Sequence, residues 1–244
     1  MADSTHHTWK YMLDRGIDYI DDEDNCLEIT GTWFPDTSTV IEGVSQRYHA
    51  GISHRKFLED IRTNSNQKYQ GFVRAMMHHG KYDSVFHSSI PFISLCKEVK
   101  NKTEDMNPSL DACSLHLFSH IASEYLISRA VNESNPEIID IMQDALSRTD
   151  LDKLNASLGE NYGIIPPEGI ASIRNIDFGE LVTPRGAFSL HTKRYAEKGT
   201  TGTEVLDKLV GRMVNDDEMD MVAETLKNLE KCFRIDPYCF NFPI

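Results

Sequence analysis

The sequence lacks any long hydrophobic run, which argues against membrane-spanning helices. No stretch of its 244 residues approaches the roughly 20 consecutive apolar side chains that a helix needs to cross a bilayer. The opening segment, MADSTHHTWKYMLDRG, also lacks the apolar core of a secretory signal peptide. We therefore expect a soluble, cytoplasmic protein with no membrane partner.

Positive charge is scarce. The chain has 25 Lys and Arg against 38 Asp and Glu, which gives a formal net charge of −13 at pH 7. A protein with this balance repels the phosphates of nucleic acid, so a nucleic-acid partner is disfavoured. Hydrophobic residues still make up 40% of the chain, which is typical of a folded globular protein.

The motifs that identify common enzyme classes are missing. The sequence contains no P-loop, no GxGxxG, no GxSxG and no protein-kinase signature. Its five cysteines are widely spaced and include no CxxC pair, so a cysteine zinc site is not expected. Without a signal peptide they should be reduced thiols. These absences favour a non-enzymatic protein.

Helix signals dominate what is present. Asn, Asp or Ser caps, often followed by proline, mark helix starts, and apolar residues then recur at three- and four-residue spacing. The longest predicted helix runs from Pro108 to about Val131. Its apolar side chains surround almost the whole circumference, so it should be central and buried. The other predicted helices cover residues 5–15, 53–62, 67–79 (ended by Gly80), 91–100, 136–148, 150–159, 203–214 and 217–234.

Two regions carry different signals. Residues 26–34 alternate in a way that suggests a strand, within a less regular segment over residues 1–50. Residues 163–202 are rich in glycine and proline, and we expect short strands there at 178–182 and 187–190. The prediction is a mainly α, single-domain chain over residues 1–244. It should form a bundle-like helical array with a small irregular, β-containing insertion near 163–202 and a C-terminal arm at 233–244.

Histidines supply the clearest candidate chemistry. His116, His120 and Glu124 follow one another at four-residue spacing on the longest predicted helix, so their side chains should form one stripe. Imidazole nitrogens and a carboxylate on one helix face can ligate zinc or non-haem iron. A buried Glu124 would also need such a partner for its charge.

A second group, His79, Asp83 and His87, repeats this spacing, although Gly80 interrupts it. Together the two groups could supply ligands for one or two metal ions in a helical bundle. The alternative is that these histidines are ordinary hydrogen-bonded residues of the core, since neither group matches HExxH or paired ExxH motifs.

Charge is unevenly distributed along the first third of the chain. Residues 16–46 contain eight Asp or Glu and no Lys or Arg, whereas residues 47–81 contain seven Lys or Arg and two acids. The two segments could compensate each other or form solvated faces. Alternatively, the basic segment could hold phosphates or an acidic partner through Arg47, Arg55, Lys56 and Arg62.

The C-terminal segment is aromatic. Tyr238, Phe240 and Phe242 alternate between Pro237 and Pro243, so an extended chain would direct all three rings to one side. We expect an arm docked in an apolar groove, either of its own domain or of a neighbouring protein.

Three functions follow from these patterns. The leading hypothesis is a non-enzymatic interaction or assembly protein, a subunit of a larger complex such as a phage or virus particle, that binds protein partners or itself. The second is a helical zinc or non-haem iron enzyme built on the His116, His120 and Glu124 stripe. The third is a binder of nucleic acid or acidic protein through residues 47–81.

Overall fold

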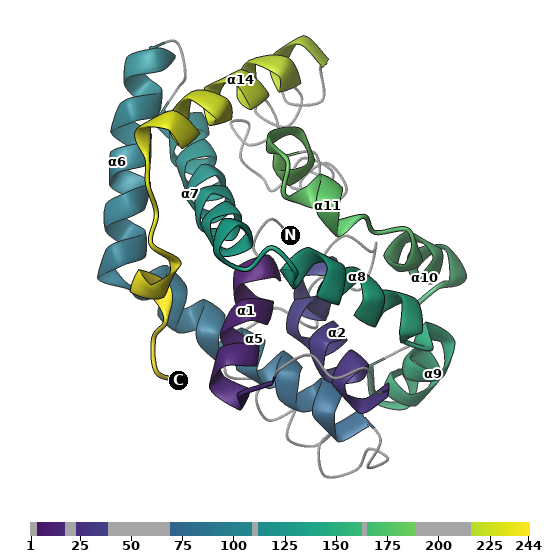
Figure 1. Ribbon diagram of the computed structural model, residues 1–244. Helices are drawn as coiled ribbons and strands as arrows, with labels where there is room; N and C mark the ends of the chain where they lie inside the picture. Colours follow the sequence, from purple (N-terminus) through teal and green to yellow (C-terminus); the bar gives the residue numbers. More distant parts are fainter. Residues whose placement is uncertain (1–3, 18–22, 39–68, 109–111, 163–164, 189–215) are drawn as a thin grey trace. The chain divides into compact units, whose positions relative to one another are not determined.

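The computed structural model is helical throughout the part of the chain that it describes, residues 4–17, 23–38, 69–108, 112–162, 165–188 and 216–244. Within these ranges there is no β-strand, so the predicted mainly α fold is confirmed there. The helices labelled in Figure 1, together with the short helix η2, are α1 (Ser4–Arg15), α2 (Glu23–Ser38), α5 (Gln70–Ser88), α6 (Ile90–Met106), α7 (Ala112–Ser134), α8 (Ile138–Arg148), α9 (Leu151–Tyr162), α10 (Pro167–Arg174), α11 (Phe178–Leu181), α14 (Asp216–Cys232) and η2 (Pro237–Phe240). None of the described helices is long and apolar enough to span a bilayer.

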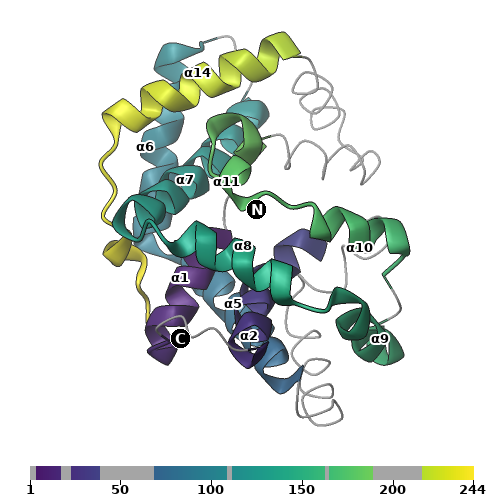
Figure 2. The ribbon, with the colours of Figure 1, turned by 45° about the vertical axis from the view of Figure 1, so that its right-hand side comes forward.

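These helices belong to two compact units. The first, called the α2 unit, comprises Ser4–Ser84 and Pro136–Phe178, and the second, called the α7 unit, comprises Val85–Asn135 and Gly179–Pro243. In the α2 unit, α1, α2 and α8 pack against one another (Figures 1 and 2). In the α7 unit, α6 packs along α7, α14 contacts α6, and η2 contacts both α6 and α7. The expectation of a single domain stays a prediction.

The predicted strand at residues 26–34 is wrong, because this segment is the centre of α2. Every residue from Ile29 to Asp36 is buried, so the burial in this segment follows neither every second position nor a single helix face. Glu23 and Asp24 lie in the first turn, where negative charge favours the helix dipole. Because α2 contacts both α1 and α8, burial on several sides obscured the helical period.

The predicted end of a helix at Gly80 is also wrong, since α5 continues to Ser88. Gly80 is exposed, and a glycine inside a helix costs only about 1 kcal/mol relative to alanine. The next turn of α5 buries Tyr82 and Phe86 completely, and their burial outweighs that cost. The glycine therefore weakens the helix locally without ending it.

The β-containing insertion is not found within residues 165–188. The segment predicted as a strand at 178–182 forms α11 and the turn after it, and residues 184–188 are helical. Gly186 allows this connection, because a Cβ atom there would overlap the carbonyl oxygen of Glu180. The Thr183 hydroxyl accepts a hydrogen bond from the Gly186 N–H at 3.1 Å. The absence of a side chain at Gly186 lets the backbone pass close to α11. Residues 189–202, including part of the second predicted strand, lie outside the described ranges.

The prediction of a buried longest helix is confirmed for α7. Between Phe118 and Val131, every side chain except those of His120 and Arg129 is buried. Helices predicted near residues 5–15, 91–100, 136–148, 150–159 and 217–234 are present within a few residues of their expected ends, except that α6 continues to Met106. The predicted helices at 53–62 and 203–214 lie outside the described residues.

The C-terminal arm packs within the α7 unit, but it is not extended throughout. Residues 237–240 form the short helix η2, which buries Phe240 and leaves Tyr238 exposed. The Phe240 ring lies 5.7 Å from the Phe86 ring and 6.4 Å from the Phe242 ring, measured between centroids. The expectation that all three rings share one side is wrong, because the turn of η2 rotates Tyr238 away from Phe240.

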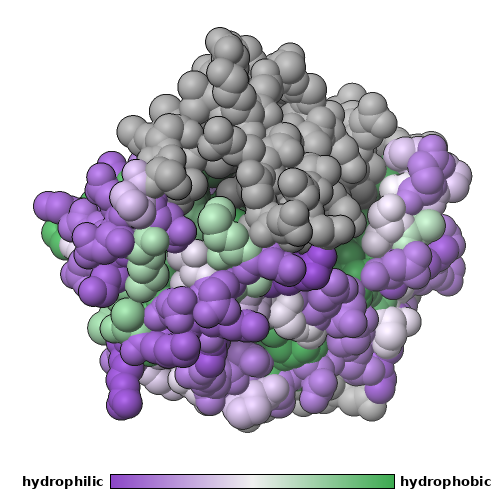
Figure 3. All heavy atoms as spheres, turned by 90° about the horizontal axis from the view of Figure 1, so that it is seen from above, coloured by the Kyte–Doolittle hydropathy of each residue, from purple (hydrophilic) through white to green (hydrophobic). Residues whose placement is uncertain are grey.

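The described surface offers few apolar side chains. In the view of Figure 3, the coloured residues are mainly hydrophilic, and hydrophobic residues appear as small separate areas. The most exposed large apolar side chain among the described residues is that of Ile90, followed at a distance by those of Tyr238 and Ile93. Small groups of exposed apolar residues of this kind are normal on protein surfaces and identify no docking site.

Candidate metal centres

The first candidate site, called the Glu124 cluster, consists of His87, His120 and Glu124 in the α7 unit. His87 lies in the last turn of α5, and His120 and Glu124 lie one turn apart on α7. Each histidine brings Nε2 to the same carboxylate oxygen, Oε1 of Glu124, at 2.7 Å from His87 and 2.8 Å from His120. Three potential ligand atoms from two helices therefore lie within 4.8 Å of one another.

The two imidazole rings of this cluster pack against each other and against an aromatic side chain of α6. The His87 and His120 rings are stacked, with centroids 5.0 Å apart and an interplanar angle of 12°. Phe92, which is buried on α6, stands edge-on to both rings at 5.0 Å and 5.3 Å. The Cys96 side chain, one turn further along α6, helps to raise the pKa of His120. The α6–α7 contact thus orients both histidines toward the carboxylate.

In the Glu124 cluster, the negative charge of the carboxylate and the positive charge of the nearby histidines stabilise each other. Burial would raise the pKa of Glu124, but the charge and hydrogen bonds of His120 and His87 hold it well below its usual range. Burial would lower the pKa of His120, but the Glu124 charge and the hydrogen bonds with Cys96 and Glu124 raise it to about 10. Among the described residues, no hydrogen bond reaches the second carboxylate oxygen, Oε2, which is buried. A buried carboxylate oxygen of this kind can still bind a cation or accept a hydrogen bond.

His116, the first residue of the predicted stripe, is exposed and does not belong to the cluster. The helix geometry gives the reason. Eight residues at 3.6 per turn leave His116 and Glu124 about 80° apart around the axis, whereas His120 and Glu124 are close neighbours. The structure brings together two of the three stripe residues, and the third donor comes from His87, which the sequence assigned to the other group.

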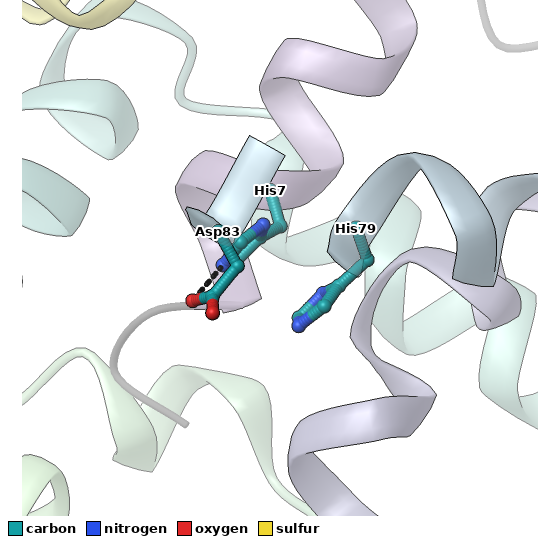
Figure 4. Close-up of side chains that lie close together, drawn as sticks. All are labelled: His7, His79 and Asp83. Carbon is teal, nitrogen blue, oxygen red and sulfur yellow. Dashed lines mark ion pairs between the residues drawn. The ribbon is translucent and has the colours of Figure 1, made fainter. Parts of the chain in front are cut away.

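The second candidate site, called the His79 cluster, consists of His7, His79 and Asp83 in the α2 unit (Figure 4). His7 comes from α1, and His79 and Asp83 lie one turn apart on α5. The His7 and His79 rings are stacked, with centroids 3.8 Å apart, and Nε2 of His7 lies 3.7 Å from Oδ1 of Asp83. Both histidines are almost fully buried, so this site is more enclosed than the Glu124 cluster.

Two residues of α2 complete the surroundings of His79. Its Nδ1–H donates a hydrogen bond of 2.6 Å to the carbonyl oxygen of Thr32, and its Nε2 lies 3.5 Å from Oδ1 of the buried Asp36. Burial would lower the pKa of His79, but the charges of Asp36 and Asp83 raise it. The Asp36 carboxylate therefore lies beside this histidine together with His7 and Asp83.

Sequence reasoning missed His7 and Asp36. His7 lies in the first half of α1, where His6, Thr8 and Lys10 are also buried. A run of polar residues that is buried on a helix signals an internal polar network, but a single sequence does not show which run is buried. The predicted basic residues Arg47, Arg55, Lys56 and Arg62 lie outside the described residues, so their proposed role in binding stays a prediction.

Comparisons with family models, with curated proteins and with solved structures give no match to this chain. The candidate function therefore rests on the geometry of the two clusters.

Proposed function

We propose that this protein binds a divalent transition metal, zinc or iron(II), at the Glu124 cluster. The observation that supports the proposal is the meeting of His87 and His120 on one oxygen of a buried carboxylate. Two imidazoles and one carboxylate form the donor set of many catalytic zinc sites and of non-haem iron(II) sites.

The spacing of the donors is close to what a metal needs. A tetrahedral zinc ion with bonds of about 2.0–2.1 Å holds neighbouring ligand atoms about 3.3 Å apart. The Nε2–Oε1 separations of 2.7 and 2.8 Å would have to increase by about half an ångström. The stacked imidazoles would also have to turn toward each other, since a metal lies in the plane of each histidine ring that binds it. Side-chain exposures of 28% for His87 and 39% for His120 leave space for that turn, whereas Glu124 is 2% exposed.

Three protein ligands leave at least one coordination position open, which is typical of catalytic rather than structural sites. Solvent reaches the site past the two partly exposed histidines. Such a metal would lower the pKa of a bound water to about 7, which would make that water a nucleophile at neutral pH. The proposal therefore includes a metal-dependent enzyme that activates water, with His87, His120 and Glu124 as ligands.

The assembly function also stays a prediction. It depended on the missing enzyme motifs and on the aromatic arm, and η2 in that arm packs on α6 and α7 of its own unit. Among the described residues, no observation favours the assembly function over the metal-binding function.

The metal content of untagged full-length protein, purified without chelator, tests the proposal. The variants His120→Gln and Glu124→Gln should each lower the bound zinc or iron by one equivalent per chain, because each removes one of three ligands. His116→Gln is the matched control, since His116 is exposed on the same helix and does not contact the cluster. Equal metal content in all three variants and the wild type would mean that the cluster is only a hydrogen-bonded ion pair.

A further inference from the structure

A cavity of about 390 Å³ lies within the α7 unit, between α7 and the C-terminal end of α14. Four residues of α7 from Leu126 to Glu133, at positions i, i+3, i+4 and i+7 of one helix face, form one wall. Four residues from Glu230 to Ile235 form the other wall. The volume is near the lower end of the about 300–1,000 Å³ that is typical of small-molecule sites, which suits a ligand of few atoms.

The cavity is separate from the Glu124 cluster, although both use α7. Leu126 follows Glu124 by two residues, which places the two side chains about 200° apart around the helix axis. The cavity and the cluster therefore lie on opposite faces of α7 and share no residue.

An ion pair between the two helices forms the less exposed polar part of the cavity wall. Arg129 of α7 pairs with Oε2 of Glu230, whose Oε1 accepts a hydrogen bond from the Tyr125 hydroxyl. Nε of Arg129 also donates a hydrogen bond to Oε1 of Glu133 at 2.8 Å. The guanidinium of Arg129 and both oxygens of Glu230 are therefore already engaged within the protein.

Two lining groups of opposite charge have capacity for a ligand. Glu133 and Arg234 are both exposed, so they lie where the cavity opens to solvent. Among the described residues, no ion pair or hydrogen bond reaches Oε2 of Glu133 or the guanidinium of Arg234. A carboxylate binds an ammonium group, and a guanidinium binds a carboxylate through two parallel N–H donors. The two groups together favour a ligand that carries both charges.

Apolar side chains form the rest of the lining. Leu126 and Ala130 are buried on α7, and Phe233 and Ile235 are partly buried in the segment after α14. An aliphatic group that replaces water against these side chains gains free energy by burial of apolar surface.

We propose that this cavity binds a free α-amino acid with an aliphatic side chain. Arg234 binds the carboxylate of the amino acid, and Glu133 binds its ammonium group. The aliphatic side chain lies against the apolar residues of both walls. This site does not depend on a metal at the Glu124 cluster.

Titration of the full-length protein with L-leucine, followed by calorimetry and by amide NMR spectra, tests the proposal. One leucine should bind per chain, and the amide signals that shift should be those of residues 126–133 and 230–235. N-acetyl-leucine lacks the ammonium group, and leucinamide lacks the carboxylate. Each should bind at least about tenfold more weakly than leucine, as expected for the loss of one charged contact.

Two substitutions test the charged contacts at exposed positions, where the fold tolerates change. Arg234→Gln and Glu133→Gln should each weaken leucine binding at least about tenfold. Arg234→Gln should also bind leucine and leucinamide equally, because the group that distinguishes them is gone. Lys231→Gln is the matched control, since it removes a positive charge three residues before Arg234. The Lys231 Nζ donates a hydrogen bond to Asn228 at 3.0 Å and does not line the cavity, so this variant should bind leucine as tightly as the wild type.

Three results would overturn the proposal. The first is the absence of saturable leucine binding with a Kd below about 1 mM. The second is equal leucine affinity of Arg234→Gln and Lys231→Gln, with circular dichroism showing that both are folded. The third is binding of N-acetyl-leucine as tight as that of leucine, because a site that ignores the ammonium group does not recognise a free amino acid.

Discussion

Replacing Gly31 with alanine should destabilise the α2 unit, because α2 and α5 approach too closely at this point for a methyl group. A Cβ atom at Gly31 would lie 2.9 Å from the Cβ of Ala75 and still closer to the carbonyl oxygen of Phe72. The oxygen belongs to the backbone of α5 and cannot rotate away. The two helices would therefore have to move apart, which would loosen the completely buried Phe72 and Ala75.

Two opposing effects set the magnitude. Alanine is better than glycine inside a helix by about 1 kcal/mol. Overpacking a core typically costs about 1–3 kcal/mol, and a clash with backbone belongs at the upper end. The net loss for Gly31→Ala should be about 2 kcal/mol, which lowers the melting temperature by roughly 4–8 °C for a chain of this size.

Gly80→Ala is the matched control, because it makes the same substitution inside a helix where nothing lies within 4 Å of the added Cβ. Only the gain in helix propensity remains, so stability should rise by up to about 1 kcal/mol and the melting temperature by roughly 2–4 °C. Thermal melting followed by circular dichroism, with urea unfolding as a check, measures both variants. A Gly31→Ala protein that melts at or above the wild-type temperature would refute the close packing of α2 on α5.

Four further substitutions test the α7 unit by urea unfolding. Tyr125→Phe removes the hydroxyl that donates a hydrogen bond to the Glu230 carboxylate of α14, and it should cost roughly 1.5–3 kcal/mol; no loss would contradict this link between α7 and α14. Ile121→Ala should cost about 2–5 kcal/mol, because Ile121 is buried at the centre of α7. Phe240→Ala should cost roughly 3 kcal/mol, whereas Tyr238→Ala should change stability by less than about 0.5 kcal/mol. If sedimentation instead shows that Phe240→Ala changes the association state and leaves stability intact, the arm docks on a partner.

The correct sequence predictions concern features that neighbouring residues determine. Ser89 caps α6 by accepting a hydrogen bond from the Phe92 N–H, and Pro91 lies in the first turn, as the sequence pattern indicates. Caps and prolines act within one turn of helix, so a local pattern is sufficient to identify them. The wrong strand at residues 26–34 arose where α2 is buried on several sides, because a helix without a solvent face loses its clear period.

The candidate sites also contain contacts that local sequence determines and contacts that depend on helix packing. The sequence alone determined that His120 and Glu124 meet, because four-residue spacing places two side chains on one helix face wherever the helix lies. The tertiary structure decided that His87 rather than His116 completes this cluster, and that His7 and Asp36 join His79. Those donors come from different helices. Their meeting depends on how the last turn of α5 packs near α7 and how α1 and α2 pack near the rest of α5. Interhelical packing is set by the shapes of whole faces rather than by the spacing of any few residues.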